Sequence, residues 1–264
     1  MRWSTLVLLK PDKNDIFLRA DITNPPAAAL QAVAQATHIV CATHLGSIDE
    51  CAADPAATSR VNVEAVRSIL RQADSRAVPV YISSNMVFSG EQAGYREDDV
   101  PAPSTEYGRQ KMEMESWIQK NFPRHVIVRL TKVYGLGRND GTLFTGWYQA
   151  LKAGEPIKAV EDMVVAPVFV GDVARTMAAL IQANEHGIFH MPGPVSASLF
   201  SLAVAAAKAW KLPAHLVEKS RRAEFNWKEK RPYWHTLAVS ERLAQLQKFY
   251  LTPAQAYSLL ENGS

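Results

Sequence analysis

The segments Val78-Pro-Val-Tyr-Ile-Ser-Ser84 and Tyr107-Gly-Arg-Gln-Lys111 decide the fold of this chain. The first is an apolar run that ends in two serines, which predicts a buried strand of a parallel sheet. In the second, Tyr107 and Lys111 lie four residues apart, so on a helix they share one face. A strand, a loop and a helix in this order predict an α/β unit that brings Ser84 near Tyr107.

Tyr107 and Lys111 form a candidate acid–base pair. The reference pKa of a tyrosine is about 10, and a neighbouring ammonium lowers it because the positive charge stabilises the phenolate. We therefore expect Lys111 to lower the pKa of Tyr107. The hydroxyl of Ser84, beside the phenol, would hold a substrate carbonyl or alcohol. Such a set can move a proton while a hydride moves elsewhere, which predicts oxidoreductase chemistry.

Short apolar runs alternate with helical stretches along the chain, a pattern typical of a parallel α/β sheet. We expect strands at residues 4–9, 16–20, 38–42, 78–83, 125–130 and 187–191. We expect helices at residues 26–36, 59–75, 104–121, 142–152, 170–183, 198–210, 240–247 and 253–261. Ser104 is the expected N-cap of the helix that carries Tyr107, because Pro101 and Pro103 prevent earlier helix growth.

The composition is typical of a protein with a large hydrophobic core, and it argues against nucleic acid and membranes as binding partners. The chain has 264 residues, 47% of them hydrophobic, and its net charge of +3 comes without a dense basic block, which argues against nucleic acid. No apolar run approaches the ~20 residues of a membrane helix, and we expect no signal peptide and no membrane contact. Cys41 and Cys51 show no metal spacing or disulfide framework, so we expect no metal site and a cytoplasmic location.

The order of these landmarks resembles the extended short-chain dehydrogenase/reductase family of NAD-dependent epimerases, dehydratases and reductases. The resemblance is strongest to the dTDP-4-dehydrorhamnose reductase branch and spans nearly the whole chain. It rests on these segments: Ala20-Asp-Ile22, His38-Ile-Val-Cys-Ala-Thr43, Arg60-Val-Asn-Val63, Ile82-Ser-Ser-Asn-Met-Val-Phe88, Tyr95-Arg-Glu-Asp-Asp99, Tyr107-Gly-Arg-Gln-Lys111, Val128-Arg-Leu-Thr-Lys-Val-Tyr-Gly135, Pro167-Val-Phe-Val-Gly-Asp172, Gly187-Ile-Phe-His190 and Arg231-Pro232.

The resemblance implies a Rossmann-like, doubly wound parallel sheet with a small C-terminal substrate lobe. We place the Rossmann-like domain at residues 1–141. The regular alternation fades after about residue 140, and residues 142–264 form mainly the substrate-binding lobe, laid over the ligand edge of the sheet. Within them, residues 164–193 are expected to return to the Rossmann sheet.

Site residues follow from the resemblance, position by position. The catalytic residues would be Ser84, Tyr107 and Lys111, with Tyr107 as proton donor or acceptor. An NAD or NADP cofactor would contact Asp21, Ile22, Ala42, Thr43, Asn62 and Lys111. A nucleotide sugar or related carbonyl substrate would contact Ser84, Asn85 and Arg231, with Arg231 facing its diphosphate. The family's habit of pairing through the helices at residues 59–75 and 104–121 implies a homodimer.

Three of these assignments have a purely structural alternative. Asp21 could instead cap a turn before Pro25. Asn62 could hydrogen-bond a neighbouring loop from its helix. Arg231 and Pro232 could form an ordinary helix-stopping turn.

The start of the chain departs from the family pattern. Family members begin with a strand, a Gly-x-x-Gly-x-x-Gly turn and a helix whose N-terminus receives the cofactor's pyrophosphate. Here Arg2-Trp-Ser-Thr-Leu-Val-Leu-Leu9 resembles the family's second strand, and no glycine occurs before Gly46. We therefore expect a sheet that is truncated or rearranged at its N-terminus. Since a missing central strand exposes ladder edges, we also expect a rearranged strand or a dimer contact to compensate.

Three explanations of this departure stand side by side. The sequence begins inside a longer natural protein, or dinucleotide binding is lost while the fold is kept, or the cofactor is held in an unusual way with help from a second subunit. The first and third explanations keep the leading hypothesis, an NAD(P)-dependent oxidoreductase of a nucleotide sugar or related carbonyl compound.

Two other functions stay open. One is a family member without redox activity that binds a ligand or regulates a partner enzyme, as one relative of the branch does for a methionine adenosyltransferase. The other is a lyase or isomerase step on the same tyrosine without nicotinamide. The missing glycine turn favours the regulatory function, whereas the presence of Ser84, Tyr107 and Lys111 favours the oxidoreductase.

Overall fold

A computed structural model describes residues 6–8, 16–18, 20–137, 140–246 and 250–262 of the chain. Its centre is a sheet of four parallel strands in the order β10-β5-β4-β3. The four are β3 (His38–Cys41), β4 (Val78–Ser84), β5 (Val126–Leu130) and β10 (Gly187–Met191). The expected α/β fold with a parallel sheet is confirmed, and each of these strands lies where the sequence predicted one.

The other elements follow the expected alternation, with extra short strands in the second half of the chain. In chain order they are β1 (Leu6–Leu8), β2 (Ile16–Leu18), α1 (Ala27–Gln35), α2 (Ile48–Ala53), α3 (Pro55–Ser59), the π-helical η1 (Arg60–Ala65), α4 (Val66–Leu70), the 3₁₀ turn η2 (Asn85–Val87), α5 (Glu106–Asn121), β6 (Val133–Tyr134), α6 (Leu143–Lys152), β7 (Ile157–Val160), β8 (Val164–Val165), β9 (Val168–Phe169), α7 (Val170–Gln182), β11 (Ala197–Ser198), α8 (Leu199–Ala209), η3 (Ala214–Leu216), β12 (Val217–Ser220), η4 (Arg222–Glu224), β13 (Trp234–His235), α9 (Glu241–Leu246) and α10 (Pro253–Asn262).

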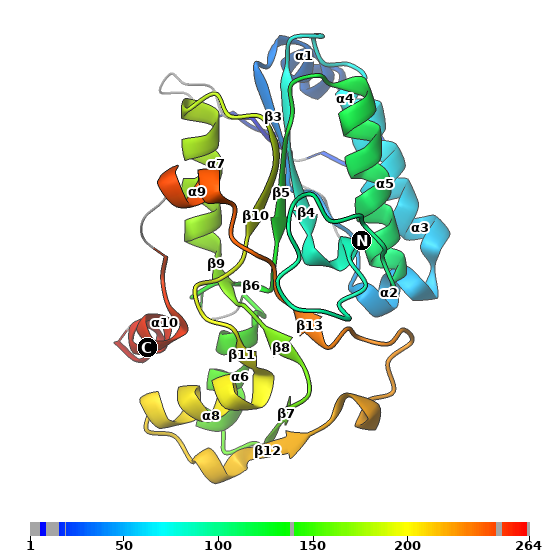
Figure 1. Cartoon of the computed structure of the whole chain (residues 1–264). Coiled ribbons are helices and arrows are strands. Elements are labelled where there is room, and N and C mark those ends of the chain that lie inside the picture. Colours follow the sequence, from blue (N-terminus) through cyan, green and yellow to red (C-terminus); the bar gives the residue numbers. More distant parts are fainter. Residues whose placement is uncertain (1–5, 9–15, 19, 138–139, 247–249, 263–264) are drawn as a thin grey trace.

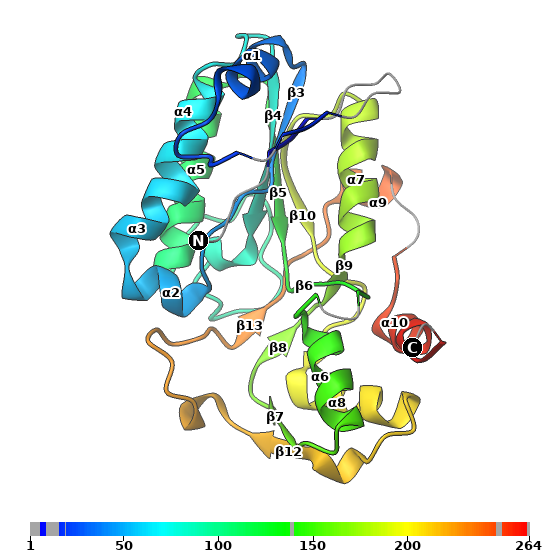
Figure 2. The same cartoon turned by 180° about the vertical axis from the view of Figure 1, so that it is seen from behind.

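Helices cover both faces of the parallel sheet (Figures 1 and 2), with α4 and α5 on one face and α7 on the other. The strands are apolar on both faces because each face is buried under helices. Tyr81 and Ile127 belong to the core under α4 and α5, while Val80 and Val128 belong to the core under α7. This two-sided burial explains why the run from residue 78 to 84 shows no polar alternation.

The N-terminal strands lie outside this sheet. β1 and β2 pair with each other antiparallel, with Leu6 opposite Leu18, and form a two-stranded sheet of their own. Among the described residues, β3 pairs only with β4. The strands predicted at residues 4–9 and 16–20 are therefore present within the described residues 6–8 and 16–18. Residues 4, 5, 9 and 19 of those predictions lie outside the described residues.

Two helix starts differ from the sequence prediction. The helix expected from Ser59 begins at Pro55, because Asp54 accepts a hydrogen bond from the Ala57 amide (2.9 Å) and proline fits the first helical position. The cap of α5 is Thr105 and not Ser104. Thr105 Oγ1 accepts from the Gly108 amide at 3.2 Å.

The second half of the chain builds a lobe at one end of the sheet (Figure 1). β7 pairs with β12, and β8 lies between β11 and β13. Helices α6, α8 and α10 pack around an aromatic core that includes Phe144, Trp210 and Tyr257, and the Trp210 indole donates to the Tyr257 carbonyl at 2.9 Å. β8 pairs within the lobe, whereas α7 and β10 lie with the sheet. We keep as a proposal a Rossmann-like domain at residues 1–141 and a lobe at residues 142–264, with residues 164–193 as the return to the sheet.

Candidate active site at the carboxyl edge of the sheet

Ser84 closes β4 at the edge where the parallel strands end. Its hydroxyl accepts a hydrogen bond from the Met86 amide at 3.2 Å and so caps the turn η2. Ser84 and Asn85 are both buried, with 7% and 8% of their surfaces exposed. Ser84 pairs in register with Leu130 of β5, so the site lies at the carboxyl ends of neighbouring strands, the usual ligand edge of an open α/β sheet.

Gly108 lets the first turn of α5 pack directly onto η2. A Cβ atom at this position would lie 2.0 Å from the Met86 carbonyl oxygen and 2.9 Å from Pro103 Cβ. Any larger side chain would push the helix away from the turn that follows Ser84. Gly108 therefore allows the close packing that brings the neighbouring Tyr107 to Ser84.

Tyr107 lies against Ser84 and His44. Burial raises the pKa of its phenol to about 12, and a hydrogen bond with the Ser84 side chain partly offsets this rise. The imidazole of His44 packs edge-on against the phenol ring, with centroids 4.8 Å apart. Although His44 keeps an exposed surface, partial desolvation of its ring and the charge of Lys111 lower its pKa to about 4.

Lys111 is 5% exposed and lies one helical turn after Tyr107. Its ammonium donates a hydrogen bond of 2.8 Å to the Ile82 carbonyl and lies 5.9 Å from the centroid of the Tyr107 ring. Burial lowers the pKa of Lys111 to about 8, and the charge of Glu115 opposes this shift. The expectation that Lys111 lowers the pKa of Tyr107 is not met, because burial of the phenol dominates and raises that pKa.

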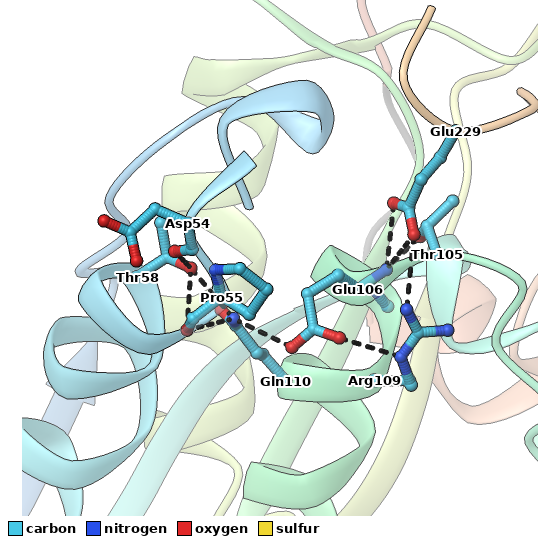
Figure 3. Close-up of polar contacts among 9 residues, drawn as sticks. Asp54, Pro55, Thr58, Thr105, Glu106, Arg109, Gln110 and Glu229 are labelled. Carbon is cyan, nitrogen blue, oxygen red and sulfur yellow. Dashed lines mark hydrogen bonds and ion pairs between the residues drawn. The ribbon is translucent and has the colours of Figure 1, made fainter. Parts of the chain in front are cut away.

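Asn62 braces the loop that carries His44. Its side-chain oxygen accepts from the Leu45 amide at 2.7 Å, and its amide donates to the Leu45 carbonyl at 3.1 Å and to Gln110 Oε1 at 2.9 Å. Gln110 continues this contact to Thr58 Oγ1 at 3.0 Å, as Figure 3 shows. Asn62 therefore does hydrogen-bond a neighbouring loop, as its structural alternative predicted. With Leu45 and Gln110 it forms the hydrogen-bonded frame beside Tyr107.

The residues predicted to contact the adenine end of a cofactor differ from one another in exposure and in their contacts. Asp21 is exposed and caps its own turn, because one carboxylate oxygen accepts from the Thr23 amide (2.8 Å) and hydroxyl (2.7 Å). The side chain of Ile22 is buried in the core, so only its backbone could meet a ligand. Ala42 and Thr43 directly follow β3, where Ala42 is exposed and Thr43 half-buried.

Arg231, predicted to face a substrate, binds a carboxylate of the protein instead. Its guanidinium lies 2.8 Å from Asp49 of α2 and 5.2 Å from the centroid of the Trp227 ring. Only 12% of its side chain is exposed. This ion pair links the lobe to the sheet domain beside the site. Arg231 is therefore more than part of a helix-stopping turn, and its guanidinium is already paired with a carboxylate of the protein.

A buried charge network behind Ser84 escaped the sequence prediction. Glu115 accepts from the Ser83 hydroxyl and from Arg129, whose Nη2 lies 2.7 Å from the carboxylate. Arg129 also meets His190 Nε2 at 3.2 Å, and all four side chains are at most 3% exposed. The available signal was spacing, since Glu115 continues the stripe of Tyr107 and Lys111 by one more turn of α5.

The described residues contain neither a membrane-length apolar helix nor a group of three His, Cys, Asp or Glu side chains placed for a metal ion. Cys41 and Cys51 are free and buried.

A family model of the RmlD substrate binding domain matches residues 5–257. The chain is 31% identical over 208 residues to the probable low-salt glycan biosynthesis reductase of Haloferax volcanii, a match that covers 76% of this chain and 69% of that protein. It is 29% identical over 168 residues to methionine adenosyltransferase 2 subunit beta of Bos taurus, which covers 61% of this chain and half of that subunit.

Among solved structures, dTDP-4-dehydrorhamnose reductase of Bacillus anthracis in complex with NADP superimposes with a TM-score of 0.79. The superposition covers 93% of this chain and 87% of that chain at 22% sequence identity. At this identity the likeness shows a shared fold. The Rossmann-like sheet with a C-terminal lobe is therefore common to both proteins.

Proposed function

The chain belongs to the RmlD substrate-binding-domain family, and from that premise we propose that it is an NAD(P)-dependent reductase of a nucleotide sugar or related carbonyl compound. The relatives that are named as reductases, one of them solved with NADP, support this reaction class. The observation that carries the proposal is the meeting of Ser84, Tyr107 and Lys111 at one edge of the sheet.

Tyr107 is the proposed proton donor to the substrate oxygen. Because burial holds its pKa near 12, the phenol is protonated at neutral pH, which is the state a donor requires. The hydroxyl of Ser84 accepts from the Met86 amide and donates over 3.4 Å to Asn85 Oδ1, a long hydrogen bond that the substrate oxygen would replace. We propose that the buried Lys111 ammonium favours the phenolate that remains when the phenol gives up its proton, an effect that burial of the phenol outweighs in the site as it stands.

The surroundings of Lys111 fit the nicotinamide ribose of NAD or NADP. The ammonium has three N–H groups and donates one hydrogen bond, to the Ile82 carbonyl, which leaves donors for ribose hydroxyls. When bound, the cofactor supplies hydride transfer. Ala42 and Thr43 at the end of β3, with Asp21, the Ile22 backbone and Asn62, are the remaining proposed contacts.

Arg231 and Asn85 are the proposed substrate contacts. Arg231 carries the positive charge that a diphosphate requires, and its present partner, Asp49, is a carboxylate of 34% exposure. A diphosphate would compete for the same guanidinium with more charge and more acceptor oxygens than a carboxylate. Asn85, next to Ser84, offers an amide to the substrate hydroxyls.

A regulatory function is the second candidate, and the similarity of the chain to methionine adenosyltransferase 2 subunit beta favours it. In that case the carboxyl edge would bind a ligand without turnover. A lyase or isomerase reaction of the same tyrosine remains the third proposal. We keep a cytoplasmic location and a homodimer as proposals of the same rank.

Calorimetric titration of the purified protein with NADPH and NADH separates these functions. The reductase proposal predicts binding in the micromolar to millimolar range, ~1 μM to ~1 mM, with NADPH oxidised when dTDP-linked or UDP-linked 4-keto sugars are added. Absence of binding up to about 1 mM contradicts the reductase and favours the regulatory function. Turnover of a sugar nucleotide without consumption of NADPH would identify the lyase or isomerase alternative.

A further inference from the structure

Residues 225–233 form a strap that runs from η4 to β13, which pairs with β8 in the lobe (Figure 1). Along its course it passes the ends of α2 and α5, the helix that carries Tyr107. Its last residues lie against Gly90, where the Trp234 amide donates to the Gly90 carbonyl at 3.1 Å and a Cβ atom would meet Pro232 Cβ at 2.1 Å. The strap is therefore closely packed against the sheet domain at this end.

Glu229 of the strap reaches the N-terminus of α5 (Figure 3). Both of its carboxylate oxygens lie 3.0 Å from the Glu106 amide nitrogen, the first of the helix, and one lies 3.2 Å from Arg109 Nη2. Thr105 already caps the Gly108 amide. Glu229 thus supplies a second acceptor and a negative charge at the positive end of a 16-residue helix.

A second anchor fixes the strap two residues further on. Asp49 of α2 accepts from the Lys228 amide at 3.1 Å and pairs with Arg231 at 2.8 Å. Two side chains of the strap therefore form ion pairs with the sheet domain, Glu229 with Arg109 and Arg231 with Asp49. Glu229 and Arg231 are 17% and 12% exposed, whereas their partners Arg109 and Asp49 are 49% and 34% exposed, so the strap side of each ion pair is the shielded one.

Hydrogen bonds between side chains connect Glu106, whose amide Glu229 binds, to the residues around Tyr107. Glu106 accepts from Arg109 Nε at 2.8 Å and from Gln110 Nε2 at 3.2 Å. Gln110 accepts from Asn62, which holds the Leu45 peptide beside His44. Glu229 therefore acts on the frame that surrounds the phenol without touching the phenol itself.

We propose that Glu229 is a positioning residue, which holds the first turn of α5 and so places Tyr107. This inference rests on the proposed function for its catalytic part. Its structural part, the clamp on the Glu106 amide, stands on the geometry of the strap and the helix. Loss of the clamp should lower turnover because Tyr107 would sample positions away from the reacting oxygen.

Glu229→Ala and Glu229→Gln test the clamp, and Glu224→Gln is the matched control. Glu224 also accepts from a backbone amide, that of Arg221 at 2.8 Å, but it lies in η4 away from α5. In Glu229→Ala, amide hydrogen exchange in the peptide 104–112 should be about tenfold faster than in the wild type, because a helix N-terminus frays when it loses a partner. Glu229→Gln keeps a hydrogen-bond acceptor, so its exchange rate in this peptide should lie between those of Glu229→Ala and the wild type.

Kinetics with NADPH and a keto-sugar nucleotide give the second readout. We expect kcat of Glu229→Ala to fall about tenfold while the Kd of NADPH is unchanged, with Glu224→Gln like the wild type. Unchanged exchange at 104–112 overturns the clamp, and faster exchange with unchanged kcat overturns the positioning role. A wild-type protein inactive on every keto-sugar nucleotide refutes the proposed function instead, and the exchange comparison alone then judges the clamp.

Discussion

The ammonium of Lys111 donates a 2.8 Å hydrogen bond to the carbonyl of Ile82, two residues before Ser84. This bond ties the helix of Tyr107 to the strand of Ser84 at the point where the two hydroxyls meet. The burial that makes the bond possible also lowers the pKa of Lys111 to about 8. The hydrogen bond to Ile82 therefore fixes the position of the ammonium, while its burial lowers the pKa.

The first prediction concerns pH. If the Lys111 ammonium stabilises the Tyr107 phenolate, kcat should fall as pH rises through about 8, where the lysine loses its proton. In Lys111→Arg the charge persists, so this fall should move to higher pH. The effect of pH on stability has the opposite sign. Between pH about 8 and about 10.4 the unfolded chain still binds the proton of Lys111 and the folded protein does not, so the free energy of unfolding rises with pH. Urea titrations of Lys111→Met should lack that rise, and a Met variant that keeps it speaks against the assignment.

The second prediction concerns the buried pair of Glu115 and Arg129, whose side chains are each 2% exposed. Glu115→Gln leaves the guanidinium without its counter-charge and should reduce the free energy of unfolding by about 3–5 kcal/mol. The control is Glu113→Gln on the same helix, where the carboxylate pairs with Arg67 but is 51% exposed, and about 0–1 kcal/mol is expected. Equal losses in the two variants, measured by urea denaturation, would show that the buried pair does not stabilise the fold as described.

The third prediction concerns Asn62, which bonds both the amide and the carbonyl of Leu45. Asn62→Ala leaves these buried groups unpaired and should cost about 1–3 kcal/mol of stability. Asn121→Ala is the control, because its amide bonds the Trp117 carbonyl at an exposed helix end and should change stability by less than about 0.5 kcal/mol. A stable Asn62→Ala protein that loses only NADPH affinity would make the residue a ligand contact and not a brace.

The fourth prediction concerns acid stability through His190. The ring is fully buried, its Nδ1 faces the Tyr95 carbonyl at 3.0 Å and its Nε2 faces an Arg129 donor, so the neutral Nδ1–H tautomer fits. Burial and Arg129 lower the pKa of His190 to about 4. The unfolded chain binds this proton near pH 6.5, so stability should fall as pH drops from about 6.5 to 4. His190→Gln should flatten that slope in urea titrations, and an unchanged slope would point to other groups.

The sequence predicted the parallel sheet well because its strands are buried on both faces. A run such as Val78–Ser84 has no alternative to the centre of an α/β protein, and the alternation with helices then sets the layers. The meeting of Ser84 and Tyr107 was also predictable. Local chemistry of helix starts was not, since Pro101 and Pro103 limited the start of α5 without deciding between Ser104 and Thr105.

Features that depend on distant partners escaped sequence reasoning. The direction of the Tyr107 pKa follows from how much protein surrounds the phenol, which spacing to Lys111 does not reveal. The partner of Arg231 is Asp49, far away in the chain, and the cap on Glu106 comes from Glu229 across the lobe. Long-range ion pairs of this kind have no periodic signature, so the strap contacts became visible only in the folded molecule.

The central claim, that Tyr107 donates the proton in an NAD(P)-dependent reduction, is tested most directly by NADPH oxidation in Tyr107→Phe. Tyr148→Phe is the matched control, since its ring packs on Trp210 in the lobe. With a 4-keto sugar nucleotide as substrate, we predict that Tyr107→Phe loses at least about a hundredfold in kcat and keeps its NADPH affinity and its melting temperature, while Tyr148→Phe stays near wild type. Turnover by Tyr107→Phe at the wild-type rate would contradict the account.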